Sequence, residues 1–178
     1  MAVLYRAHYA SRPVEEAFLK AEIPHAVYSG MPFYGRKEIK DSLAYLRLVA
    51  YQDDLSFMRV ANVPKRNLGQ RRMAFLKDYA EAHACSLFQA LEQTIEDEIF
   101  KRTKAKQLVA LVRKFRGLFE GRPVSEVLAA LINESGYEQA LRTEGSQERL
   151  DNVAELKQSI YEFENSCGEE VTLEHYLS

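Results

Sequence analysis

The amino-acid sequence predicts a mainly α-helical protein with a short strand-helix-strand segment at its N-terminus. From Gly30 onward, apolar residues recur at the spacing of amphipathic helices almost throughout. Residues 1–29 instead combine two short apolar runs with a single helical pattern. The chain has 178 residues, of which 47% are hydrophobic and 28% charged, a composition typical of one globular domain.

The N-terminal segment reads as part of an α/β sheet. Residues 2–5 and 25–28 are short apolar runs and are predicted strands. Between them, Ser11 is predicted to cap a helix that carries Val14 and Phe18 on its apolar face. Because two strands and one helix cannot enclose a core, we expect the elements that cover them to belong to sequence outside this chain.

Capping residues and helix breakers delimit the helices predicted after Gly30. Asn62-Val63-Pro64 interrupts one helix, because proline cannot donate the hydrogen bond that continues it. Gly136 suits the left-handed position that follows a helix. The predicted helices cover residues 36–50, Asp53 or Asp54 through Val60, 70–83, a segment capped by Ser86 through Leu91, 102–119, 123–135 and 147–164, and Thr172 caps a last fragment over 173–177.

The charge is segregated along the chain although the net charge is only −2. Residues 55–77 hold six bases and no acid, and residues 100–119 hold seven bases and no acid. Residues 134–178 reverse this, with 11 acids and 3 bases. Such segregation creates a local field that attracts phosphate. For residues 101–116, however, a solvated helix face is the favoured interpretation.

The basic residues of the first window flank a turn between two predicted helices, residues 62–70. Gly69 permits close backbone approach, and the free N–H groups at the start of the next helix form an anion site. With Lys65, Arg66, Arg71 and Arg72 beside it, the best-suited ligand is a nucleic-acid phosphate backbone, bound independently of base sequence. A tight interhelical turn with solvated bases explains the same residues equally well.

The sequence carries no pattern for catalysis or metal binding. It lacks the P-loop GxxxxGKS/T, HExxH and GxSxG, and its His, Cys and acidic residues show no metal-ligand spacing. Cys85 and Cys167 form no CxxC pair, which fits a reducing cytoplasm. No apolar run approaches 18 residues, so no membrane span is predicted. We therefore expect no catalytic residue, metal or cofactor in this chain, and a cytoplasmic location.

Several ordered blocks resemble the motifs of the UvrD/PcrA/Rep superfamily 1 DNA helicases. Four of them lie between residues 3 and 69, and two shorter ones lie between residues 135 and 152. The blocks are Val3-Leu4-Tyr5-Arg6 with Ser11-Arg12-Pro13-Val14-Glu15-Glu16-Ala17, Ile23 to Gly30, Phe33 to Asp41 with Leu43 to Arg47, Asp53-Asp54 with Asn62-Val63-Pro64-Lys65-Arg66, and then Ser135-Gly136-Tyr137 and Arg149-Leu150-Asp151-Asn152.

The resemblance implies a piece of a larger motor protein. Residues 1–29 would be the last strand-helix-strand of the second RecA-like motor domain, called 2A. Residues 30–178 would be most of its helical accessory domain, called 2B, which rotates about a hinge at Ser29 and Gly30. ATP and Mg²⁺ would be bound by other parts of the parent chain, so the isolated chain should not hydrolyse ATP.

The resemblance also assigns DNA contacts. Arg6 and His8 would touch single-stranded DNA on the motor surface. The turn would hold the duplex backbone near the junction of single and double strands, through Lys65, Arg66, Asn67, Leu68, Gly69, Arg71 and Arg72. The expected function is an accessory duplex-binding and regulatory domain of an ATP-dependent 3′→5′ DNA helicase acting in repair or replication. A helical protein–protein interaction module with an incidental basic turn is the alternative.

Overall fold

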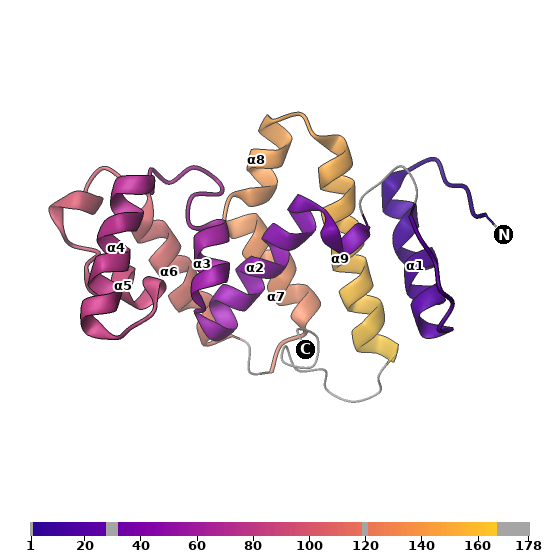
Figure 1. The fold of residues 1–178 in the computed structure, drawn as a ribbon, viewed down its shortest axis with the longest axis horizontal. Helices are drawn as coiled ribbons and strands as arrows, with labels where there is room; N and C mark the ends of the chain where they lie inside the picture. Colours follow the sequence, from indigo (N-terminus) through magenta and orange to yellow (C-terminus); the bar gives the residue numbers. More distant parts are fainter. Residues whose placement is uncertain (1, 28–31, 119–120, 167–178) are drawn as a thin grey trace.

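The computed structural model describes residues 2–27, 32–118 and 121–166, and all regular structure in these ranges is helical. Figure 1 shows an elongated arrangement with α1 beside the N-terminus at one end and α4 to α6 at the other. The elements are η1 (His8–Ala10), α1 (Ser11–Lys20), η2 (Phe33–Gly35), α2 (Lys37–Tyr51), α3 (Asp54–Val60), α4 (Gln70–His83), α5 (Leu87–Gln93), η3 (Glu98–Phe100), α6 (Ala105–Arg116), α7 (Val124–Glu134), α8 (Tyr137–Thr143) and α9 (Gln147–Ser166).

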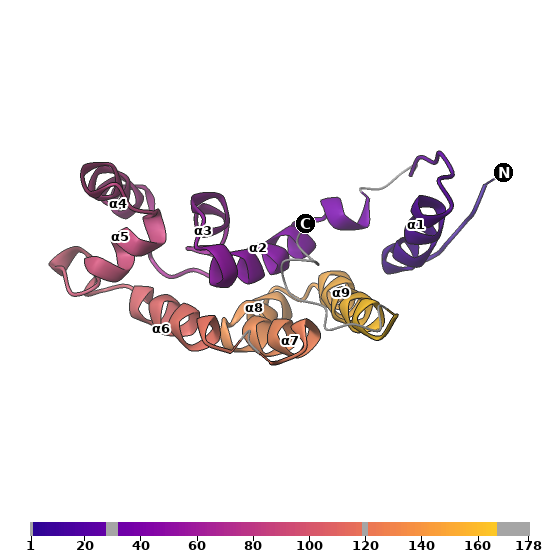
Figure 2. The ribbon, with the colours of Figure 1, turned by 90° about the horizontal axis from the view of Figure 1, so that it is seen from below.

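Helix α2 is the centre of the core. Figure 2 shows it between α3 on one side and the row formed by α6, α7 and α9 on the other, and α2 contacts all four helices. Tyr45, Leu46, Leu48 and Val49 are therefore all buried, although they lie on more than one face of the helix. A helix that is apolar on most sides can be stable only where neighbours cover it on most sides.

Most predicted helices are confirmed, and two of them, α3 and α5, start at a side-chain cap. Asp53 caps α3 by accepting a hydrogen bond from the backbone N–H of Ser56 (2.9 Å). Ser86 and Gln89 form a reciprocal capping box at the start of α5. Helix α4 spans the residues predicted for it, whereas α6 is shorter than the predicted 102–119 at both ends. The predicted Thr172 cap and the fragment over 173–177 lie outside the described residues.

The two predicted N-terminal strands are not seen in the described residues, which include 2–5 and 25–27 but not Tyr28. Residues 2–5 and 23–27 are described without strand structure, and no backbone hydrogen bond joins the two segments in that part of the chain. A strand is stabilised by a neighbouring strand, which the described segments do not provide. The predicted Ser11 cap is also wrong, because Ala10 precedes α1 and the Ser11 hydroxyl accepts a hydrogen bond from Arg36 instead (3.1 Å).

Helix α8 is not among the helices that the sequence predicts. Gly136 adopts a left-handed conformation (φ +78°), as predicted for the residue after a helix, but α8 begins at the next residue. The new helix is only seven residues long and has no side-chain cap, so its local signal is weak.

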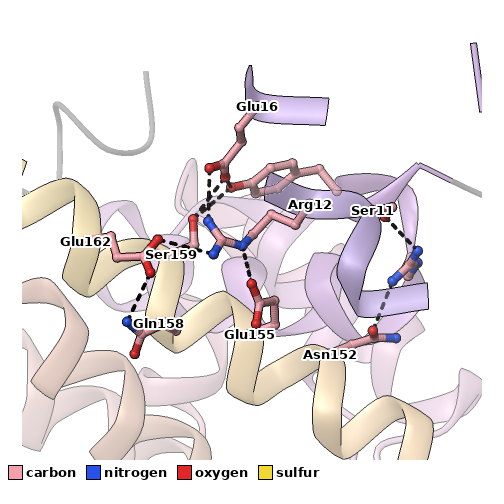
Figure 3. Close-up of polar contacts among 10 residues, drawn as sticks. Ser11, Arg12, Glu16, Asn152, Glu155, Gln158, Ser159 and Glu162 are labelled. Atoms are coloured by element: carbon pink, nitrogen blue, oxygen red, sulfur yellow. Dashed lines mark hydrogen bonds and ion pairs between the residues drawn. The ribbon is translucent and has the colours of Figure 1, made fainter. Parts of the chain in front are cut away.

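Polar contacts attach α1 to α9 (Figure 3). The side chain of Arg12 is 5% exposed, and its guanidinium donates to Glu155 (2.6 Å), Glu162 (3.2 Å) and, within α1, Glu16 (2.9 Å). Burial disfavours the charged form of Arg12, whereas the neighbouring glutamates stabilise it. The net effect raises the pKa of Arg12. The N-terminal helix is thus joined to the helical body mainly through charge.

No helix in the described ranges is both long enough and apolar enough to cross a membrane.

Candidate nucleic-acid interface

The turn between α3 and α4 is shaped by one amide side chain. Asn62 Oδ1 accepts hydrogen bonds from the backbone N–H groups of Arg66 (2.8 Å) and Leu68 (3.2 Å), which closes the turn on itself. Asn67 adopts the left-handed conformation (φ +62°) that asparagine tolerates better than most residues. The side chain of Leu68 is buried in the core, so this residue anchors the turn from beneath.

Arg66, which the sequence predicts to contact a phosphate, faces the interior of the protein. The residue is 4% exposed. Its guanidinium donates to the carbonyls of Val60 (2.8 Å) and Ala61 (3.3 Å) at the C-terminal end of α3, and to the carbonyl of Ser135 (3.1 Å) at the end of α7. A cation suits this position, because carbonyls at helix C-termini lack partners within the helix and carry partial negative charge.

The hydroxyl of Tyr45 links Arg66 to α2. It accepts a hydrogen bond from Arg66 (2.7 Å) and donates one to the carbonyl of Val63. Burial raises the pKa of Tyr45, so the hydroxyl stays protonated and keeps both contacts. The turn is therefore held in place by α2, by α3 and by the corner between α7 and α8.

The other bases of the turn lie nearer the surface than Arg66 does. Lys65 and Arg71 are exposed, and neither forms an ion pair with any described residue. Arg72 is half-buried, and its guanidinium donates to the carbonyl of Ile99 (2.7 Å) and contacts Asn67 Oδ1 (3.4 Å). Gly69 precedes α4 with open space around its Cα and no side-chain cap over the first N–H groups of the helix.

A second basic segment lies beside the turn. Asn67 Nδ2 donates to the carbonyl of Arg102 (2.9 Å), and the N–H of Lys104 donates to the carbonyl of Arg66 (3.0 Å). Arg102 and Lys104 are exposed and, within the described ranges, form no ion pair. We call Lys65, Arg71, Arg102 and Lys104 the basic surface.

The other bases between residues 101 and 116 are engaged with acids. For these bases this agrees with the solvated helix face that the sequence favoured for residues 101–116. The pairs are Lys101–Glu98, Lys106–Glu96 (2.7 Å), Arg113–Glu92 (2.6 Å), Lys114–Glu134 (2.6 Å) and Arg116–Glu92 (3.8 Å). The absence of acids from residues 100–119 indicated a positively charged segment that includes Arg102 and Lys104. The sequence alone could not distinguish these two bases from the ones that pair with acids.

The remaining predicted site residues lie elsewhere. Arg6 is exposed and belongs to the segment before α1, at the opposite end of the molecule from the turn (Figure 1). The structure therefore does not bring Arg6 to the basic surface. The side chain of His8 and the hinge residues Ser29 and Gly30 lie outside the described residues. No group of three or more His, Cys, Asp or Glu side chains is placed to hold a metal ion in the described part of the chain.

Known proteins match this chain over its whole length. Residues 1–177 match the family described as UvrD-like helicase C-terminal domain. The chain is 35% identical to the ATP-dependent DNA helicase PcrA of Bacillus subtilis and 34% identical to the PcrA proteins of Staphylococcus epidermidis and Staphylococcus aureus. Each match covers 100% of this chain and 25% of the relative, so the chain spans a quarter of the length of these helicases. The chain belongs to the family of UvrD-like helicase C-terminal domains.

Proposed function

We propose that this chain is an accessory domain of an ATP-dependent 3′→5′ DNA helicase and that it grips duplex DNA by its phosphate backbone and regulates unwinding. The observation that carries the proposal is the basic surface, in which two segments far apart in the sequence place unpaired cations around a rigid turn. The relatives named ATP-dependent DNA helicase supply the class of parent protein.

The chemistry of the basic surface suits the phosphate backbone of duplex DNA. Lys65 and Arg71 flank Gly69, where a phosphate can approach the uncapped first turn of α4. Arg102 and Lys104 extend the positive charge along the neighbouring segment. Because these groups offer charge and backbone N–H donors, they fit phosphates and carry no base-reading pattern. Arg66 supports this surface from inside and does not touch DNA.

Salt titration of duplex binding tests the proposal. One variant replaces the four residues of the basic surface by alanine. A matched control replaces four of the five paired bases, Lys106, Arg113, Lys114 and Arg116, so that both variants lose the same charge. The slope of log affinity against log salt changes by about 0.9 for each phosphate contact. We expect the first variant to lose most affinity and about 3 to 4 units of slope, and the control to lose little. Equal losses in the two variants would show that only net charge matters, and the turn would not be the contact.

ATP and Mg²⁺ act, in this proposal, in the remainder of the parent chain. The 178 residues contain no P-loop, so they lack groups that cradle the phosphates of ATP. We expect no ATP turnover by the purified chain, with or without DNA, in a coupled phosphate-release assay. Turnover above background would contradict this division of labour. We also propose a cytoplasmic location, where such a parent would meet DNA.

We further propose that residues 1–29 belong to the RecA-like motor and residues 30–178 to the accessory domain, which rotates about Ser29 and Gly30. The charged contact of Arg12 with Glu155 and Glu162 supports this, because an ionic interface separates more readily than an apolar one. Arg12→Ala should speed hydrogen exchange in α1 and leave α2 unchanged. Unchanged exchange in α1 would count against a separable N-terminal segment. Arg142→Ala, which removes another ion pair, is the control.

A helical protein–protein interaction module is the competing function. It predicts that alanine substitution of the basic surface leaves duplex binding as weak and as salt-dependent as before.

A further inference from the structure

A groove on the outer side of α2 is unexplained by the proposed DNA contact. It has a volume of about 540 Å³ and lies where η2, α2 and α3 meet. Figure 2 shows α3 on the side of α2 opposite to α7 and α9, so this side of α2 is not covered by the helical row. The residues that carry its chemistry are Tyr34, Lys40, Leu43, Arg47, Leu55 and Arg59.

The apolar part of the groove is built from two helices. Lys40, Leu43 and Arg47 are spaced i, i+3 and i+7 along α2, so they form one stripe about two turns long. Leu55, on α3, lies on the facing wall and is 78% exposed. A leucine this exposed beside a hollow gains most by receiving an apolar group from a partner.

The groove is positively charged. None of the lining residues in the described part of the chain is acidic, and three of them are cationic. Arg59 Nε contacts the buried carboxylate of Asp41 (2.9 Å), but Lys37 also pairs with that carboxylate (2.7 Å), so the single negative charge is already balanced. An occupant that brings carboxylates to Lys40 and Arg59 would therefore meet complementary charge.

The combination favours a peptide over a nucleic acid. Leucine side chains in the wall offer nothing to a phosphate backbone, whereas they fit the apolar anchors of a helix laid into a groove. The ring of Tyr34 is packed edge-on against Phe33, and its hydroxyl donates to the carboxylate of Glu16 (3.1 Å). That carboxylate is paired with Arg12 (2.9 Å), so it adds no net negative charge at this end of the groove.

We propose that this groove docks an amphipathic helix of a partner protein, with leucine-type anchors between Leu43 and Leu55 and carboxylates facing Lys40 and Arg59. The proposal is independent of the basic surface and of duplex binding, because no residue is shared between them. The chain would thus hold DNA on one surface and an acidic helix on another.

The test uses the ¹⁵N-labelled chain and a synthetic helical peptide of about 14 residues with leucines along one face and glutamates on both flanks. We expect amide shifts confined to residues 34–59 and saturation below millimolar peptide. The same peptide with lysines in place of glutamates, or alanines in place of leucines, should bind at least about tenfold more weakly. Equal binding of the lysine peptide, or no shifts at millimolar acidic peptide, would overturn the proposal.

Variants locate the site. Leu55→Ser should weaken peptide binding about tenfold, the loss expected for one apolar anchor, and Lys40→Glu should weaken it further at low salt. The matched controls are Leu19→Ser, since Leu19 is 65% exposed on α1, and Lys77→Glu on α4; both should bind the peptide normally. All four proteins should keep their helical circular dichroism. If Leu55→Ser binds normally, or if single-stranded or duplex DNA shifts residues 34–59 in place of the peptide, the groove is not a peptide site.

Discussion

Replacing Arg66 by alanine should destabilise the whole protein, although the residue lies in a surface turn. Its guanidinium, in a residue that is 4% exposed, donates to the carbonyls of Val60 and Ser135 and to the hydroxyl of Tyr45. Without it, the Val60 carbonyl keeps only the N–H of Val63, the Tyr45 hydroxyl keeps only the carbonyl of Val63, and the Ser135 carbonyl loses this donor. Each buried polar atom left without its partner costs about 1–3 kcal/mol. The loss of the cation from two helix C-termini adds to this. We therefore expect the free energy of unfolding to fall by about 3–5 kcal/mol, a large share of the ~5–15 kcal/mol typical of a domain.

Urea unfolding followed by circular dichroism measures this loss. Arg71→Ala is the matched control: it removes the same charge from an exposed position and should change stability by less than about 0.5 kcal/mol. Arg66→Lys keeps the charge but not the several donors of the guanidinium, so its stability should fall between the two. If Arg66→Ala and Arg71→Ala unfold at the same urea concentration, and Arg66→Ala instead lowers the salt slope of duplex binding by about one contact, Arg66 is a phosphate ligand and the reasoning fails.

Two further predictions concern the corner after α7 and the outer helices. Gly136→Ala should lower the free energy of unfolding by about 1–2 kcal/mol, because φ of +78° strains an L residue. The new Cβ would lie 3.7 Å from Pro64 Cγ, an ordinary contact, so the backbone strain alone is responsible. Gly117→Ala, in open space with negative φ, should leave the free energy of unfolding unchanged in the same urea assay. The pKa of Glu138 is lowered, chiefly by the hydrogen bond from Lys157 (3.0 Å). The Glu138 carboxylate therefore stabilises the folded protein above about pH 4.3, and this stabilisation is lost as the pH falls through the pKa of the folded state. The stability difference between the parent and Glu138→Gln should shrink towards zero below that pH, and a difference that stays constant in acid would refute the assignment.

Local signals explain where two of the predicted helices, α3 and α5, begin. The starts of α3 and α5 depend on Asp53 and Ser86, whose side chains bond to N–H groups three residues away. Such a signal is complete within the sequence window that contains it. The prediction of the N-terminal strands was wrong for the opposite reason, because a strand is stabilised by a neighbouring strand, which this segment does not contain. The weakly signalled α8 became a helix through packing against α7 and α9.

The order of residues is enough to establish that this protein is mainly helical and that a cationic, acid-free turn separates two of its helices. Which of those cations face solvent depends on how the helices pack in three dimensions. Arg66 turns inward because the fold brings the C-terminal carbonyls of α3 and α7 to the same point, and Arg102 and Lys104 join Lys65 and Arg71 because backbone hydrogen bonds set two distant segments side by side. Residue charge is a property of the sequence, but the partner that neutralises a charge, or leaves it free to bind, is chosen by contacts between segments far apart in the chain.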